Sequence, residues 1–173
     1  MSLGAQVRID SKPLRVPSDL DSSICLYQQL SANNREKFDR AAYWMDMASR
    51  QWTDSISASF ASLVSSVESL TERGVTHNIF CDTCKNSVPH DVPGATEKFR
   101  AYFEKYAPGA SLAKHRSKMY QLRSKILHGS ELIQLDRDRA LGWDPPGFNQ
   151  MELVRELSGL TQIAARNWLK SPS

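Results

Sequence analysis

Residues 54–70 read DSISASFASLVSSVESL, and the spacing of the apolar residues in this stretch decides the fold. The apolar residues recur every three or four positions, which is the spacing of one face of an α-helix. They are Ile56, Phe60, Leu63, Val64, Val67 and Leu70. Residues 34–51 show the same spacing, and only Trp52 and Thr53 separate the two segments. We therefore expect two helices that pack antiparallel as a helical hairpin.

Further helices are expected on both sides of this hairpin. Helical spacing also occurs in residues 19–30, 95–107, 111–128 and 149–170. Together these segments predict an all-α fold, an antiparallel helical bundle of about five main helices in one domain over residues 19–173. Residues 1–18 are expected to form a short extended N-terminal arm. Gly74 is expected to end the helix that starts at Asp54, and residues 75–94, with two prolines and a Cys-x-x-Cys, are expected to be an insertion or loop.

The composition is that of an ordinary soluble globular protein. The chain has 173 residues, of which 40% are apolar and 24% charged, and a formal net charge of +3. No run approaches the roughly 18 uninterrupted apolar residues of a membrane helix. The N-terminus lacks the basic-then-apolar order of a signal peptide. We expect a cytoplasmic protein without membrane contact, whose small positive charge permits a polyanionic partner but does not demand one.

The segment most suggestive of chemistry is KMYQLRSKILHG, at residues 118–129. It places the permanent cation Arg123 five residues before the imidazole of His128, and Gly129 marks the end of the helix. Metal-independent phosphodiester cleavage uses a histidine to move protons and an arginine to hold phosphate charge. The bland interpretation is that Arg123 is a surface cation and His128 a C-terminal capping residue.

The helix over 111–128 is predicted to have two faces that need a partner. The stripe toward the core is Leu112, Met119, Leu122 and Ile126, and the second face is Tyr120, Arg123, Ser124, Leu127 and His128. This second face packs either on another element of the chain or on a second copy of it. Arg123 and His128 are about 140° apart on an ideal helix. A symmetric dimer would bring two arginines and two histidines into one cleft.

The string Tyr120-x-x-Arg123-Ser124-Lys125-Ile126-x-His128-Gly129 resembles the HEPN (higher eukaryotes and prokaryotes nucleotide-binding) superfamily, particularly its Apea-like branch. Arg40-Ala41, Glu68-Ser69-Leu70 and Tyr106-Ala107-Pro108-Gly109 extend the resemblance, which covers roughly residues 20–170. It implies a helical bundle that dimerises through the motif helix. It also implies an Arg-x(4–6)-His site that cleaves RNA without a metal cofactor, often in defence, toxin–antitoxin or abortive-infection systems.

Carried over, this site consists of Arg123 and His128. Active members commonly have Asn, Asp or His directly after the arginine, whereas Ser124 forms hydrogen bonds but holds no charge. Other members are non-catalytic, so the alternative is an RNA- or nucleotide-binding or regulatory module, with an antitoxin or regulatory protein as a further partner. Glu68 either orients Arg123 across the bundle or is a solvated charge. Tyr120 either contacts substrate or packs in the dimer face.

The basic residues of the helix over 111–128 are a second possible sign of RNA binding. They are Lys114, Arg116, Lys118, Arg123 and Lys125. Such a row can track a phosphate backbone, but no aromatic platform for stacking bases accompanies it. The alternative is a solvated helix face, and His115 within it is expected to be solvated.

The insertion contains Cys81-Asp82-Thr83-Cys84-Lys85-Asn86, which has the spacing of a zinc knuckle. Asn86 suits the left-handed conformation that such turns often need. One Cys-x-x-Cys supplies only two ligands for a structural zinc. The remaining ligands are His77, His90 or Cys25, or a second knuckle from a dimer mate. The alternative is a reduced hairpin without metal.

Overall fold

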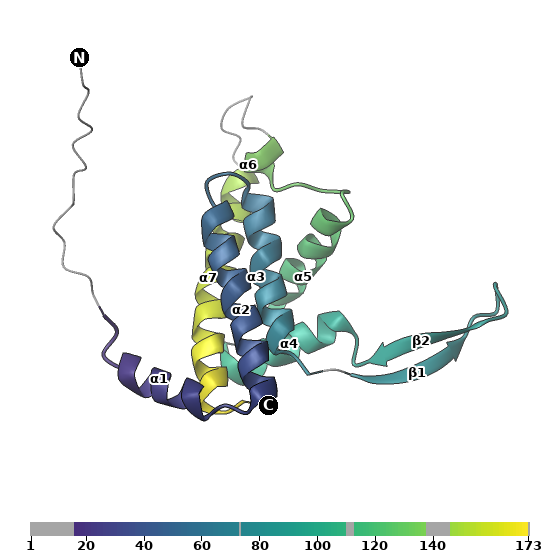
Figure 1. Ribbon diagram of the computed structural model, residues 1–173. Coiled ribbons are helices and arrows are strands. Elements are labelled where there is room, and N and C mark those ends of the chain that lie inside the picture. Colours follow the sequence, from purple (N-terminus) through teal and green to yellow (C-terminus); the bar gives the residue numbers. More distant parts are fainter. Residues whose placement is uncertain (1–15, 73, 110–112, 138–145, 173) are drawn as a thin grey trace, which may run out of the picture.

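The computed structural model describes residues 16–72, 74–109, 113–137 and 146–172 (Figure 1). Its elements are α1 (Leu20–Gln29), α2 (Ala32–Gln51), α3 (Ile56–Leu70), β1 (Val75–Phe80), β2 (Ser87–Val92), α4 (Ala95–Tyr106), α5 (Ala113–Leu127), α6 (Gln134–Arg137) and α7 (Pro146–Lys170). The chain is therefore mostly helical, and the expected helical bundle is confirmed at that level. The expected arm lies almost entirely in residues 1–15, outside the described residues, as does Leu112. No described helix is both long and apolar enough to cross a membrane.

Helix α3 is the central element of the bundle. It contacts α2, α4, α5, α6 and α7. All six residues of its predicted apolar stripe are buried, and Phe60, Val64 and Val67 are inaccessible to solvent. The apolar faces of the other helices close around it, including the four buried aromatic side chains of α4 and Trp168 of α7. Because α3 is enclosed on most sides, a polar side chain on it must meet a partner from a neighbouring helix.

Helices α2 and α3 lie side by side as the expected antiparallel hairpin (Figure 1), and serine side chains join them. The hydroxyl of Ser59 donates to the carbonyl of Ala48 at 2.7 Å, and that of Ser66 donates to the carbonyl of Ala41 at 2.9 Å. Both serines and both alanines are buried. Small side chains allow two helix backbones to approach closely, and the hydroxyls find acceptors in that approach.

The two ends of α3 differ from a simple reading of the sequence. Its N-terminus is capped by Ser55 and also by Asp136, which follows α5 in the chain. The carboxylate of Asp136 accepts hydrogen bonds from the Ser55 hydroxyl at 2.9 Å and from the backbone N–H groups of Ile56 and Ser57 at 2.8 and 2.7 Å. At the other end, the helix stops at Leu70 and not at Gly74, because Thr71 turns to an extended conformation.

Residues 75–92, expected to belong to an insertion or loop, form an antiparallel β-hairpin. Val75 pairs with Val92 and Phe80 with Ser87. Pro89 is tolerated because the ladder alternates from the bonded pair Cys81–Asn86, which makes Asn78–Pro89 a non-hydrogen-bonded pair in which no N–H is needed. Gly74 stands at its base, where an added Cβ would lie 3.0 Å from the Val92 carbonyl oxygen. The hairpin extends away from the bundle (Figure 1).

Candidate functional site

Helix α5 presents the predicted core stripe to the bundle. Met119 and Leu122 are buried, and Ile126 packs against the core cluster. Tyr120, assigned to the second face, is only 8% exposed and its ring lies 5.3 Å from that of Phe99 on α4. The second face of α5 is thus partly covered by this same chain. Tyr120 does not project outward into a dimer face.

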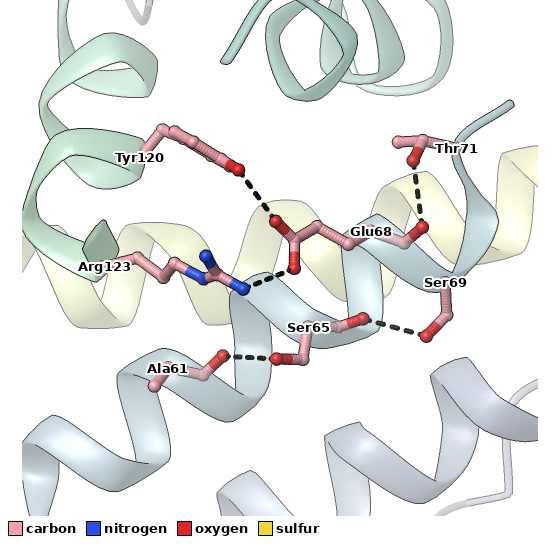
Figure 2. Close-up of polar contacts among 7 residues, drawn as sticks. All are labelled: Ala61, Ser65, Glu68, Ser69, Thr71, Tyr120 and Arg123. Atoms are coloured by element: carbon pink, nitrogen blue, oxygen red, sulfur yellow. Dashed lines mark hydrogen bonds and ion pairs between the residues drawn. The ribbon is translucent and has the colours of Figure 1, made fainter. Parts of the chain in front are cut away.

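Glu68 joins α3 to α5 by accepting two hydrogen bonds (Figure 2). Its Oε1 accepts from the Tyr120 hydroxyl at 2.9 Å, and its Oε2 accepts from Nη2 of Arg123 at 2.8 Å. Glu68 is therefore not a solvated charge: it contacts Arg123 across the bundle. Because each carboxylate oxygen accepts from a different residue, Arg123 binds Glu68 through one N–H group and does not form a bidentate ion pair with it. Among the described residues Arg123 has no second hydrogen-bond partner, and its Nε is buried without one.

The position of Glu68 is unfavourable for the helix that carries it. It stands in the last turn of α3, where a carboxylate meets the negative end of the helix dipole. The hydroxyl of Thr71 fastens this turn by donating to the Glu68 carbonyl at 2.9 Å (Figure 2). The guanidinium of Arg123 and the phenol of Tyr120 then compensate the side-chain charge. The contacts with α5 therefore account for a glutamate at this position, because a carboxylate in the last turn does not stabilise α3 itself.

The same contacts change the acidity of Tyr120. Burial, then the hydrogen bond to Glu68 and the charge of that carboxylate, raise the pKa of Tyr120 to about 12, against a smaller opposite effect of Arg123. The phenol therefore keeps its proton at neutral pH. It acts as a fixed hydrogen-bond donor to Glu68.

His128 lies just beyond α5 and marks its end. The N–H of Gly129 donates to the carbonyl of Ile126, and the N–H of Ser130 donates to the carbonyl of Lys125, each at 3.0 Å. With Gly129 at φ +70°, this is a Schellman motif, in which His128 is the C-cap residue. The His128 side chain is exposed and forms no hydrogen bond to the described residues. The single chain therefore unites Glu68, Tyr120 and Arg123, but it does not bond His128 to them.

The basic residues of α5 do not form one face. Arg116 is only 2% exposed and donates to the carbonyl of Ala107 at 2.7 Å, so it fastens the α4–α5 connection. Arg123 is paired with Glu68, and Lys125 with Glu131 at 2.9 Å. His115 is exposed, and its Nδ1 lies 2.9 Å from Oε2 of Glu156. A continuous basic track along α5 is therefore not present in the described side chains.

The Cys-x-x-Cys occupies the turn of the hairpin. The N–H of Cys81 donates to the carbonyl of Asn86 at 2.9 Å, and the N–H of Lys85 donates to the carbonyl of Cys81 at 2.8 Å. The left-handed residue is Lys85, at φ 57°, and not Asn86. Hydrogen bonds from Cys84, backbone first, and from Thr83 lower the pKa of the Cys81 thiol below its ordinary value.

The further zinc ligands considered from the sequence do not reach this turn. His77 lies four residues before Cys81 on an extended strand, about 13 Å away along it, and His90 pairs with His77 in the backbone register. Cys25 belongs to α1, on the opposite side of the bundle from the hairpin (Figure 1). No group of three or more potential metal ligands occurs among the described residues.

A groove of about 400 Å³ opens elsewhere, between α2, α3 and α7. Its lining includes Met45, Trp52, Leu63 and Arg155, and none of Glu68, Tyr120, Arg123 or His128. Comparisons of the chain with protein-family models, curated proteins and solved structures find no match. The site must therefore be interpreted from its own residues.

Proposed function

We propose that this chain is a metal-independent endoribonuclease of the HEPN type, which acts as a homodimer and uses Arg123 and His128 as catalytic residues. The single observation that carries the proposal is the contact between Glu68 and Arg123 (Figure 2). It holds the guanidinium in place through one N–H and leaves other donors for a phosphate group. The resemblance of residues 120–129 to the HEPN motif supplies the reaction type.

In this mechanism the ribose 2′-oxygen attacks the adjacent phosphorus. His128 removes the 2′-hydroxyl proton as general base, and the resulting imidazolium, as general acid, gives a proton to the leaving 5′-oxygen. Arg123 stabilises the additional negative charge of the five-coordinate phosphorus. The products carry a 2′,3′-cyclic phosphate and a 5′-hydroxyl.

The orientation of the two catalytic residues within one chain supports a dimer. Arg123 turns toward Glu68 on α3, whereas His128 stands in solvent at the end of α5. Leu127, beside His128, is 54% exposed although it is apolar. A second copy packed against this end of α5 would cover Leu127 and set the histidine of one subunit near the arginine of the other.

A non-catalytic RNA- or nucleotide-binding module is the alternative, and a specific observation favours it as well. Glu68 neutralises part of the Arg123 charge, and Ser124 adds none next to it. Such a cleft would bind a nucleotide, or a regulatory protein such as an antitoxin, without turnover.

The test is cleavage of single-stranded RNA by the purified chain in excess EDTA, with analysis of the product ends. We expect 2′,3′-cyclic phosphate ends, and a loss of at least roughly a hundredfold in rate for both Arg123→Ala and His128→Ala. His115→Ala, which changes an exposed histidine of the same helix, is the matched control and should retain activity. If His128→Ala cleaves as fast as the unchanged chain, the proposal is wrong. If the folded chain binds RNA but leaves it intact, the binding module is the better description.

Mixing the two inactive variants tests the shared cleft. If each cleft combines Arg123 of one subunit with His128 of the other, a mixed dimer contains one intact cleft. Equal mixing then restores about one quarter of the original activity. Clefts built within single subunits would restore none.

A further inference from the structure

The turn of the β-hairpin carries two cysteines at the spacing of a zinc knuckle. The N–H of Cys81 donates to the carbonyl of Asn86 and the N–H of Lys85 donates to the carbonyl of Cys81, so a tight turn closes around the two cysteines. Lys85 adopts a left-handed conformation that residues other than glycine rarely take. Two cysteines three residues apart in a tight turn can supply half of the ligands of a tetrahedral zinc.

The other half is not available within the described chain. A structural zinc takes four ligands, and the turn provides two. His77 is about 13 Å away along its strand, Cys25 is on the far side of the bundle, and no larger cluster of ligands occurs in the described residues.

One face of the hairpin carries exposed apolar side chains. Residues opposite each other and two apart along a strand share a face, so the apolar pairs Val75–Val92 and Ile79–Val88 lie on one face, with the pair His77–His90 between them. The four valine and isoleucine side chains are all about half exposed or more. By the same alternation Cys81, whose N–H bonds Asn86, follows Ile79 on this face. A two-stranded hairpin is marginally stable in water unless such a face is covered.

We propose that Cys81 and Cys84 are two ligands of a zinc ion whose other two ligands are the same cysteines of a second copy of this chain, and that the apolar faces of the two hairpins pack in that contact. A second copy supplies the missing thiolates in the required number and type. It also brings an apolar face of identical shape, as a two-fold contact requires. The three cross-strand pairs of this face, Val75–Val92, His77–His90 and Ile79–Val88, contain no Asp, Glu, Lys or Arg, so no permanent side-chain charges oppose each other across it. The contact does not depend on RNA cleavage.

The test uses the full chain, purified with zinc chloride and a non-thiol reductant. We expect about one zinc per two chains, with four sulfur neighbours at about 2.3 Å in zinc-edge X-ray absorption. Cys81→Ser and Cys84→Ser should each remove the zinc and halve the mass of the assembly in light scattering. Cys25→Ser, the matched control on α1, should change neither. One zinc per chain, a site with two sulfur and two lighter ligands, or no zinc in the reduced protein would each overturn the proposal.

Ile79→Thr separates the apolar contact from the metal ligands. The change keeps a β-branched residue in an exposed strand position, so the hairpin is expected to form. We expect the concentration at which the zinc-bound assembly dissociates to rise roughly tenfold or more. An unchanged dissociation concentration would contradict the packing of the two hairpin faces. Zinc content and the mass of the assembly are measured without an activity assay. A negative result for the zinc contact can therefore be told apart from a negative result for the proposed ribonuclease.

Discussion

Removal of the Glu68 carboxylate tests whether the contact between α3 and α5 holds Arg123 and Tyr120 in place. Glu68→Ala deletes the acceptor of both side chains and leaves a partly buried guanidinium unpaired. Hydrogen bonds to a charged group contribute about 1.5–3 kcal/mol each. The side chains of Arg123 and Glu68 are 23% and 29% exposed, however, so the ion pair is partly screened by solvent. We expect a total loss of about 2 kcal/mol.

The assay is urea unfolding followed by far-UV circular dichroism. With a slope of about 2 kcal/mol per molar urea, this loss moves the midpoint down by about 1 M. Glu68→Gln keeps an acceptor for the Tyr120 hydroxyl but loses the charge that faces Arg123, so it should cost about half as much. Glu104→Ala, at an exposed glutamate of α4, is the matched control and should stay within about 0.5 kcal/mol of the unchanged protein.

A double-mutant cycle separates this contact from general damage to the helix. Tyr120→Phe alone removes a hydroxyl that donates to Glu68, and it should cost about 1 kcal/mol. In the Glu68→Ala background the same change should cost close to nothing, because its acceptor is already absent. Equal costs in both backgrounds, or a Glu68→Ala loss no larger than that of Glu104→Ala, would refute the reasoning.

Three further predictions concern the frame of the site. Although burial alone would raise the pKa of Asp136, hydrogen bonds from Ser57 and its neighbours lower it below 3.8, so Asp136→Asn should lose about 1–2 kcal/mol at neutral pH. The difference in unfolding free energy between the unchanged protein and Asp136→Asn should reach its full size above pH 3.8 and shrink as the pH falls below that value. Urea titrations at a series of pH values will measure it. Gly129→Ala should cost about 1 kcal/mol in thermal unfolding, because Gly129 has φ +70°. Ser66→Leu should lower stability by several times more than Ser66→Ala in the same measurement, because Ser66 is fully buried against the α2 backbone at Ala41.

Helices were predictable here because their signal is local. The apolar spacing of α3 lies within one segment, and all of those positions are buried as expected. The hairpin was anticipated only as the alternative to a zinc knuckle at the Cys-x-x-Cys, and its two strands were not predicted. Every residue of β1 is exposed, so no core imposes the alternation of apolar and polar residues by which strands are recognised.

The cap on α3 was missed because nothing local signals it. Ser55 already marks the N-terminus, and Asp136 lies 80 residues after Ile56 in the chain. The buried position of Arg116 was missed in the same way. A basic residue on an amphipathic helix is normally exposed, and only the loop carbonyl of Ala107 explains why this one is not.

The order of the main helices, the C-terminal end of α5 and the choice of Arg123, His128, Glu68 and Tyr120 as candidates were determined by the sequence alone. Whether Glu68 met solvent or Arg123 was decided only by the tertiary structure. Two residues 55 positions apart are brought within 2.8 Å by the way α5 packs on α3, and no local pattern encodes that rotation. The tertiary structure likewise placed the thiols at the tip of an exposed hairpin, away from the other cysteine, because distances between elements follow from packing and not from spacing along the chain.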